Sequence, residues 1–394
     1  MLALLLLPSL LRTGSENPAK DLRPFNQWPA IMSHDAMTGE WYSATFASKA
    51  ETASNVTDRD PVADWGITQS AGLVQQLWCG ARAFDYRPYC RNGEVLAHHG
   101  GFTINKKLPD VVAEVRAWLR AVPVALVLIY FSHADGDANC GGTVANWLAG
   151  LGIYTINCAD VTRLTIAEVY ARGLRSDLGQ GGSLVAIFDC MDERFDDSVN
   201  CYTGFSDTCY SGPGDGGNEA WRRMKSYYVG STLTRGGALW MTQLHWQLTP
   251  TTITYGTLHG SSVLMDEQRG GVNAWAGLAL RNQGGSLAPQ VCDNVCFRHN
   301  VHQRRQSLVS CPFPPPSPPK STEQVINFVE VDNVCDHGTD IYQALLDTYP
   351  APSIGCACVP RVARCTSCYA AVRCRPQPPD PCAYSGGLRL VWFP

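Results

Sequence analysis

The sequence lacks an excess of either charge. Its 31 Lys and Arg residues are balanced by 35 Asp and Glu residues, so the formal net charge is only -4. Proteins that attract nucleic acid or acidic membranes over long distances need a surplus of basic residues. The composition therefore argues against a nucleic-acid partner and implies that any anionic ligand is bound by a few local side chains.

Long hydrophobic runs are scarce. The apolar stretch from Met1 to Leu11 has the length of the apolar part of a secretory signal and is too short to cross a bilayer. No basic residue precedes it, but small residues follow it at Thr13, Gly14 and Ser15. We predict a signal peptide over residues 1–15, and no later segment is long and apolar enough for a transmembrane helix.

Cysteine, by contrast, is abundant. Seventeen cysteines are spread over the 394 residues, as is usual for disulfide-bonded proteins of an oxidising compartment. A glycosylation sequon at Asn55-Val56-Thr57 fits the same environment. The sequence thus predicts a secreted, extracellular protein.

The chain is longer than a single hydrophobic core usually supports, so we expect one large domain and a smaller appendage. Apolar, β-branched runs alternate with helical periodicity, which favours βα units and a parallel sheet. In the clearest unit, apolar residues at spacings of three and four predict a helix from Lys107, which Pro123 ends. The run Val124–Phe131 that follows is apolar on both faces, as a strand covered by helices must be.

Similar strand candidates recur along the chain. They are Trp28–Met32, Ala81–Tyr86, Gly152–Ile156, Leu184–Phe188, Ala238–Leu244 and Val325–Val331. Seven or eight such strands fit a closed (β/α)-barrel of the TIM-barrel type better than an open sheet. We assign this α/β barrel to residues 21–350.

Two segments interrupt the alternation. The Pro-rich stretch at 311–320 fits neither a helix nor a central strand, so we expect a loop inserted before the last strand. Residues 351–394 form a Cys-rich appendage that we expect disulfides to hold together. Cys365 and Cys368 have zinc-ribbon spacing, but without a matching second pair disulfides are the better reading.

Polar residues gather at the ends of the predicted strands. Ser33-His34-Asp35 follows the first strand, Asp85-Tyr86-Arg87 closes the next, and His98-His99-Gly100 closes the extended run after it. The carboxyl ends of barrel strands converge on one mouth, where such enzymes carry out their chemistry. A single histidine is more often structural than functional, but the joint pattern predicts a site.

Two histidines and an arginine suit the displacement of a phosphodiester. One histidine removes the proton of the attacking hydroxyl while the other protonates the departing oxygen. An arginine between them matches the oxygens of the phosphate and offsets their charge. None of these steps requires a metal ion.

These motifs resemble the X domain of phosphatidylinositol-specific phospholipase C, and most closely its bacterial, metal-independent branch. The similarity lies in the order of Ser33-His34-Asp35, the run Gly80–Arg87 and His98-His99-Gly100. It extends to the run Ile326–Asp332 and the helix Asp340–Tyr349, which look like the last strand and helix of that barrel. The resemblance implies a phospholipase C that acts on phosphatidylinositol or a glycosylated derivative.

The resemblance also implies a role for each matching residue. His34 would be the general base toward the inositol 2-hydroxyl, with Asp332 orienting its ring, and His99 would be the general acid, supported by Asp35. Arg87 would bind the phosphate, and Asp85 would position Arg87 or assist the acid. His98 faces away from His99 in an extended run and is expected to be structural.

The sequence departs from this family at several positions. Calcium-dependent relatives carry an acidic residue where this chain has Arg87, and a guanidinium would repel a cation, so we predict no metal and no cofactor. Asp189 ends a strand where bacterial enzymes have an inositol-binding arginine, and Phe131–His133 occupies the region of another basic residue. Asp189 is therefore a candidate head-group ligand. Cys79 and Cys90, foreign to the bacterial pattern, are expected in disulfides of undetermined pairing.

Two other functions remain open. The chain could be a secreted interaction protein whose barrel has lost turnover, or a metal-dependent enzyme of the glycerophosphodiesterase or sphingomyelinase type. Retention of both histidines, Arg87 and Asp332 favours the metal-independent enzyme. Its partner would be a phospholipid, and four aromatic residues could form a surface for transient contact with the membrane. These are Trp240, Trp246, Tyr255 and Trp275.

Overall fold

The computed structural model describes residues 17–40, 61–176, 181–194, 196–214, 218–233, 239–283, 326–349, 354–356 and 368–370. The predicted signal peptide, the sequon at Asn55, the Pro-rich insertion and most of the Cys-rich tail lie outside these ranges. The chain divides into two compact units, Met1–Ala351 and Pro352–Pro394. In the second unit, β13 (Ile354–Cys356) pairs antiparallel with β14 (Cys368–Ala370). Its role as a separable tail stays a prediction.

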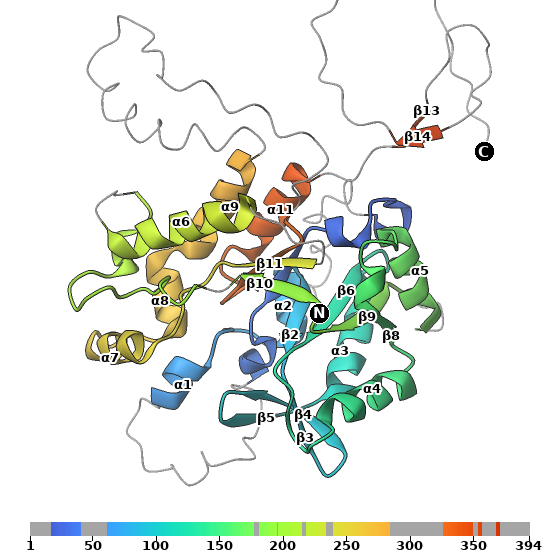
Figure 1. The fold of residues 1–394 in the computed structure, drawn as a ribbon, viewed down its shortest axis with the longest axis horizontal. Helices are drawn as coiled ribbons and strands as arrows, with labels where there is room; N and C mark the ends of the chain where they lie inside the picture. The colour runs from blue at the N-terminus through green and yellow to red at the C-terminus, as the bar shows by residue number, and fades with distance from the viewer. Residues whose placement is uncertain are drawn as a thin grey trace, which may run out of the picture. The chain divides into compact units, whose positions relative to one another are not determined.

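The first unit is built on a parallel sheet of eight strands, shown between two groups of helices in Figure 1. Its strands are β1 (Ala30–Ser33), β2 (Ala81–Tyr86), β6 (Leu126–Phe131), β8 (Tyr154–Ile156), β9 (Ser183–Phe188), β10 (Met191–Arg194), β11 (Leu239–Gln243) and β12 (Phe328–Val331). They are ordered β10-β11-β12-β1-β2-β6-β9-β8, and every neighbouring pair is parallel.

Two features of this order require the sheet to curl into a barrel. The first strand, β1, pairs with the last, β12. In addition, β9 and β10 stand six places apart in the sheet, which is about 29 Å in a flat sheet. Only Asp189 and Cys190 join these strands, and three peptide steps span at most about 11 Å. The predicted (β/α)-barrel is therefore confirmed.

Helices and short connections surround the sheet. The helices are α1 (Pro61–Gly66), α2 (Leu73–Trp78), α3 (Leu108–Ala121), α4 (Cys140–Gly150), α5 (Ile166–Ser176), α6 (Glu219–Leu233), α7 (Pro250–Leu258), α8 (Val263–Gly270), α9 (Val272–Gln283) and α11 (Gly338–Thr348). The 3-10 helices are η1 (Pro18–Lys20), η2 (Phe25–Gln27), η3 (Ala36–Glu40), η5 (Cys158–Asp160) and η6 (Cys209–Ser211). None of the helices in the described ranges could span a membrane.

A second, smaller sheet begins directly after β2 in the chain. It contains β3 (Pro88–Arg91), β4 (Glu94–His99), β5 (Phe102–Lys107) and β7 (Asp135–Gly136). Because β3 and β4 are antiparallel, with Pro88 opposite Ala97, the chain turns back and carries the end of β4 to the barrel mouth. His99 thus reaches the mouth from this hairpin and not from a barrel strand.

Side chains alternate along the strands between the helical layer and the barrel interior. The interior is apolar at its lower end and polar at the mouth. In β12, Val329 and Val331 face outward into the helical layer, and Phe328 faces the barrel interior. The interior cluster also holds Met32 and Met241, and residues before β1 close its lower end. Since side chains alternate with a period of two, the interior positions beyond Phe328 are Glu330 and Asp332. The fold therefore places acidic groups directly above an apolar core.

Disulfides connect distant parts of the barrel. The described pairs are Cys79–Cys335, Cys90–Cys140, Cys158–Cys190 and Cys201–Cys209. The expectation that Cys79 and Cys90 are disulfide-bonded is confirmed, and the structure supplies their partners. Cys79–Cys335 spans 256 positions and joins the start of β2 to the segment after β12.

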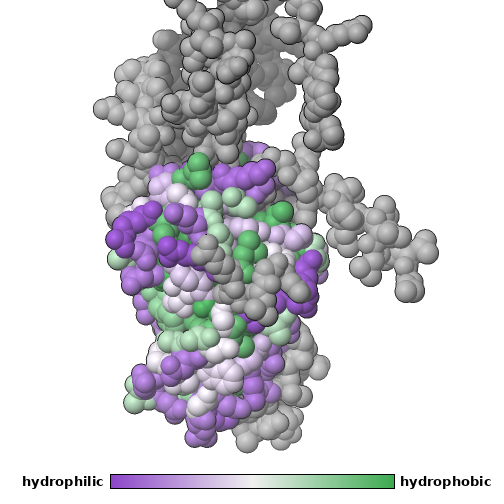
Figure 2. All heavy atoms as spheres, turned by 90° about the vertical axis from the view of Figure 1, so that its right-hand side faces the viewer, coloured by the Kyte–Doolittle hydropathy of each residue, from purple (hydrophilic) through white to green (hydrophobic). Residues whose placement is uncertain are grey.

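The expected aromatic membrane surface is wrong. Trp240, Trp246 and Trp275 are only 4, 2 and 8% exposed, and Tyr255 is partly buried. Trp275 packs edge-to-face on two aromatic rings in the layer formed by α6 and α9. These rings therefore stabilise the core. On the face that carries α4 and α5, the visible apolar side chains lie in small groups among polar ones (Figure 2).

Candidate active site

The structure brings six predicted catalytic residues to one cavity of about 470 Å³ at the carboxyl ends of the strands. They are His34, Asp35, Asp85, Arg87, His99 and Asp332. The first four come from the ends of β1 and β2, His99 from β4 and Asp332 from the end of β12. Their convergence follows from the barrel, and their catalytic roles stay predictions.

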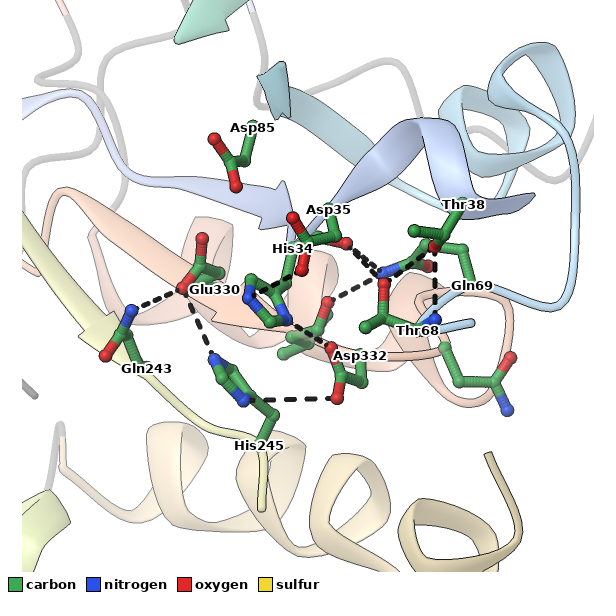
Figure 3. Close-up of polar contacts among 12 residues, drawn as sticks. His34, Asp35, Thr38, Thr68, Gln69, Asp85, Gln243, His245, Glu330 and Asp332 are labelled. Atoms are coloured by element: carbon green, nitrogen blue, oxygen red, sulfur yellow. Dashed lines mark hydrogen bonds and ion pairs between the residues drawn. The ribbon is translucent and has the colours of Figure 1, made fainter. Parts of the chain in front are cut away.

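The backbone around His34 is held by two side chains that follow α1. Thr68 Oγ1 donates to the carbonyl of His34 at 2.9 Å, and Gln69 Nε2 donates to the same carbonyl at 3.0 Å. Gln69 Nε2 also lies 3.0 Å from the carbonyl of Val331, so one amide ties β1 to β12 (Figure 3). Asp35 follows with φ 42°, a left-handed conformation that aspartate tolerates better than most residues. This turn points the Asp35 carboxylate back into the mouth.

His34 has partners for both of its protonation states. Nδ1 lies 2.6 Å from Asp332 Oδ1, so the carboxylate fixes a proton on that nitrogen. Nε2 lies 3.1 Å from Arg87 Nη2 and 3.2 Å from Asp35 Oδ2. A neutral ring accepts a hydrogen bond from Arg87, and a protonated ring pairs with Asp35. Nε2 is therefore a suitable atom for gaining and losing a proton.

His99 is held by two acceptors. Its Nδ1 lies 2.8 Å from the carbonyl of Gly66, and its Nε2 lies 3.1 Å from Asp35 Oδ2. A carbonyl and a carboxylate both accept hydrogen bonds, so each ring nitrogen faces an acceptor for an N–H. His99 is thus placed as a proton donor, with Nε2 near the same oxygen that faces His34.

Arg87 is fixed by two buried carboxylates. Its Nε lies 2.9 Å from Asp85 Oδ2 and 2.7 Å from Asp35 Oδ1. Asp85 Oδ1 in turn accepts from Ser132 Oγ at 2.6 Å. With Nε held in this way, the terminal nitrogens of the guanidinium extend into the cavity. This geometry agrees with the expected role of Asp85 in positioning Arg87.

Electrostatics set the charge of the central groups. Burial disfavours protonated His34, but the negative charges of Asp35, Asp332 and Glu330 and the hydrogen bond to Asp332 outweigh it, and raise the pKa of His34 to about 10. Burial raises the pKa of Asp35, but the positive charges of His99, His34 and Arg87 hold it well below its usual value. The resting site therefore has an ionised Asp35 and a protonated His34 at neutral pH.

The structure does not bring Asp189 to this cavity. Asp189 is exposed in the link between β9 and β10 and does not line it. Ser132 and His133, which follow β6, do line it, in the region where the family has a basic residue. His98 also lies outside the lining, with Nδ1 3.1 Å from the carbonyl of Arg87.

Several residues of the site carry no signal that the sequence analysis used, among them Gln247, which also lines the cavity. His245 lies just past the end of β11, Gln243 ends that strand, and Glu330 lies in β12. All three are buried and line the cavity. One signal was available for Glu330, because it stands two residues before Asp332 in an otherwise apolar strand and so shares its face.

Among the residues that the structure describes, two groups of side chains bring enough ligand atoms together for a metal ion. They are His34, His245 and Glu330, and His34, Asp35 and Asp85. In the second group, the guanidinium of Arg87 already contacts both carboxylates. In the first group, the two imidazoles are stacked at 4.1 Å with planes 13° apart. Their lone pairs lie in nearly parallel planes and do not converge on a point between them. Neither arrangement fits a cation, and a metal-free site stays a prediction.

Comparison with solved structures finds bacterial enzymes. A phosphatidylinositol-specific phospholipase C from Staphylococcus aureus, containing pentafluoro-Phe, matches over 83% of this chain and 93% of its own, with a TM-score of 0.47 and 13% identity. The phosphatidylinositol-specific phospholipase C from Listeria monocytogenes matches over 84% of this chain and 98% of its own, with a TM-score of 0.46 and 12% identity. No family model and no curated protein matches the sequence. At this distance, function has to be argued from the site of this chain.

Proposed function

We propose that the chain is a secreted phosphodiesterase that cleaves phosphatidylinositol-type lipids by general acid and base catalysis. The observation that carries the proposal is the convergence of two imidazoles on one carboxylate oxygen. His34 Nε2 and His99 Nε2 lie 3.2 and 3.1 Å from Asp35 Oδ2, beside the guanidinium of Arg87. A phosphodiester at this point would meet a base, an acid and an anion-binding group together.

In the proposed reaction, the 2-hydroxyl of the inositol gives its proton to His34 Nε2 while its oxygen forms a bond to phosphorus. The bond between phosphorus and the diacylglycerol oxygen breaks, and that oxygen takes a proton from His99 Nε2. Arg87 offsets the charge on the non-bridging oxygens. The products are diacylglycerol and a cyclic inositol phosphate, so the reaction is a lyase reaction of the phospholipase C type.

The lining of the cavity suggests which head group it accepts. Arg87 is the only Arg or Lys among the described lining residues, which suits one phosphate. The lining also contains the uncharged polar side chains of Ser132, Gln243 and Gln247, which suit the hydroxyls of a polyol. We assign the head group to these side chains in place of Asp189.

We also propose that the protein contacts its lipid substrate at the membrane surface. Phe205, Ile253 and Leu258 are 53, 37 and 66% exposed. They follow the carboxyl ends of β10 and β11, the same end of the barrel as the cavity. The Phe205 ring stacks on His259 at 4.6 Å, which holds it at the surface. Apolar groups in this position would enter the lipid interface beside the mouth.

The roles of the two histidines are tested by changing the leaving group. His34→Ala and His99→Ala should each lower turnover of phosphatidylinositol by about a hundredfold or more, the usual scale for a proton-transfer group. An aryl phosphodiester needs little protonation of its departing oxygen. Turnover of this substrate should therefore recover far more in His99→Ala than in His34→Ala. His337→Ala, in an exposed loop, serves as the control and should behave like the unaltered protein.

Three outcomes would contradict the proposal. Equal restoration of both variants would mean that the base and acid are assigned wrongly. Loss of activity with a chelator would contradict metal-independent catalysis. A folded protein with no turnover of any phosphodiester would favour a secreted binding protein.

A further inference from the structure

His245 stacks on the ring of His34, and the carboxylate of Glu330 contacts His245. The rings of His245 and His34 are stacked with centroids 4.1 Å apart and planes 13° apart. His245 Nε2 lies 3.4 Å from Glu330 Oε2, and its Nδ1 lies 3.9 Å from Asp332 Oδ2. Figure 3 shows His245 between the two acidic residues, with Glu330 turned away from Asp332. None of the catalytic steps described above uses His245 or Glu330.

Glu330 is an unusual residue for the interior of a barrel. It is only 1% exposed and lies opposite Met32 of β1 and Gln243 of β11 in the sheet register. Its Oε2 accepts a hydrogen bond from Gln243 Nε2 at 2.9 Å. Burying a carboxylate costs several kcal/mol unless charged or hydrogen-bonding groups compensate. That cost is on the order of the net free energy of unfolding of many domains. An apolar residue at this position would avoid that cost.

The groups around Glu330 show what compensates its charge. Burial raises the pKa of Glu330, but the charge of His34 and the hydrogen bond from His245 lower it below its usual value. Glu330 is therefore ionised when His34 is protonated. The charges of Glu330 and His34 therefore stabilise each other.

We propose that His245 and Glu330 form a positioning pair that holds the ring of His34 and stabilises the positive charge it acquires when it takes a proton. The inference rests on the proposed function, in which His34 is the base. Glu330 supplies a negative charge whose carboxylate oxygen lies within 4.8 Å of a ring nitrogen of His34. His245 contacts the face of His34 as a flat ring and reaches Glu330 through its Nε2.

Charged and titratable groups approach His34 from several sides. Asp35 and Arg87 face its Nε2, and Asp332 faces its Nδ1. Asp85 brings a carboxylate oxygen within 4.8 Å of a ring nitrogen of His34 and is paired with Arg87. His99 meets the same oxygen of Asp35, and Glu267 of α8 lies beyond Asp332. Asp35 and Asp332 approach nitrogens at the edge of the His34 ring. Glu330 contacts His245, whose ring stacks on the face of His34.

Glu267 offers a matched control. It is buried like Glu330, and its Oε1 accepts from the backbone N–H of Trp246 at 2.7 Å. Burial, together with the charge of Asp332, raises the pKa of Glu267 well above its usual value, which favours its neutral form. Glu267→Gln therefore replaces a buried carboxyl whose neutral form is favoured. Glu330→Gln removes a charge and keeps the volume and a partner for Gln243.

The pair is tested by following the titration of His34 by NMR, which needs no substrate. Glu330→Gln should lower the pKa of His34 by about one unit or more, the usual effect of losing a nearby opposite charge. Glu267→Gln should leave it within about 0.3 unit of the unaltered protein, because burial already favours the neutral form of Glu267. An unchanged pKa in folded Glu330→Gln would overturn the proposal.

A second comparison tests the ring of His245 and does not depend on the stability of Glu330→Gln. His245→Ala should lower kcat by about tenfold or more with little change in KM, because the orientation of a catalytic group affects the transition state most. His245→Phe restores a flat ring and should recover most of kcat. Equal losses in both variants would overturn the positioning role of the ring. A lowered pKa of His34 in a protein that cleaves no phosphodiester would instead contradict the proposed function.

Discussion

Replacing Asp332 by asparagine should lower the proton affinity of His34 and shift the pH dependence of turnover. Asp332 Oδ1 lies 2.6 Å from His34 Nδ1 and is one of three carboxylates that, against the effect of burial, raise the pKa of His34 to about 10. Asparagine has nearly the same shape but no charge. The variant thus changes the base without emptying space beside it.

The size of the effect follows from that pKa. At about pH 7, three units below it, roughly one part in a thousand of the free enzyme holds neutral His34. If neutral His34 is the base, kcat/KM for an aryl phosphodiester, which needs little protonation by His99, rises about tenfold per pH unit between about pH 7 and pH 9 and levels off near the pKa of His34. In Asp332→Asn the midpoint should move down by about one to three units. The plateau itself should fall by roughly a hundredfold or more, because nothing then holds the ring in its reactive tautomer.

The sign of the stability effect gives a separate check. The folded-state pKa lies above the ordinary value of 6.5, so protonation of His34 stabilises the fold fully below that pH and the contribution is lost as pH rises through about 10. The free energy of unfolding of Asp332→Asn should therefore approach that of the unaltered protein as pH rises.

A soluble phosphodiester avoids interfacial effects, and kcat/KM would be measured at constant ionic strength across this pH range. Asp340→Asn, an exposed carboxylate of α11, is the control and should leave the profile unchanged. A profile of the unaltered protein that stays flat from about pH 7 to pH 9, or falls over it, would refute His34 as a base of this proton affinity. An unchanged midpoint in Asp332→Asn would refute the electrostatic explanation.

Two further predictions concern the surroundings of the site. Truncation after residue 351 should lower secretion or thermal stability but leave turnover of a soluble substrate unchanged, since the second compact unit begins at Pro352; a truncated protein that is folded by circular dichroism yet inactive would show that the tail belongs to the site. Phe205→Ser and Leu258→Ser should each weaken binding to phosphatidylinositol-containing vesicles by up to roughly tenfold, because each removes exposed apolar surface. Leu22→Ser, equally exposed but before β1, is the control, and equal weakening by all three variants would contradict a lipid contact at the mouth.

The sequence by itself predicted every barrel strand except β10, together with the order of the candidate site motifs. β2 has the predicted bounds, Ala81–Tyr86, and the predicted helix before Pro123 is α3. These features depend on local patterns, because an apolar run or a helical period is set by neighbouring residues. The ends were less certain, and β12 begins at Phe328 instead of Val325, because a strand extends only as far as its neighbours pair with it.

Only the tertiary structure decided which side chains meet. Glu330 and His245 face the site because the barrel curls β11 and β12 around the same interior. The periodicity of each strand alone does not reveal this arrangement. The same curvature leaves Asp189 outside the cavity and buries Trp275 beneath helices. The partner of Cys79 lies 256 positions away, and such pairings depend on the path of the whole chain. Residue types and strand ends thus predicted the chemistry, whereas long-range packing determined which residues surround His34.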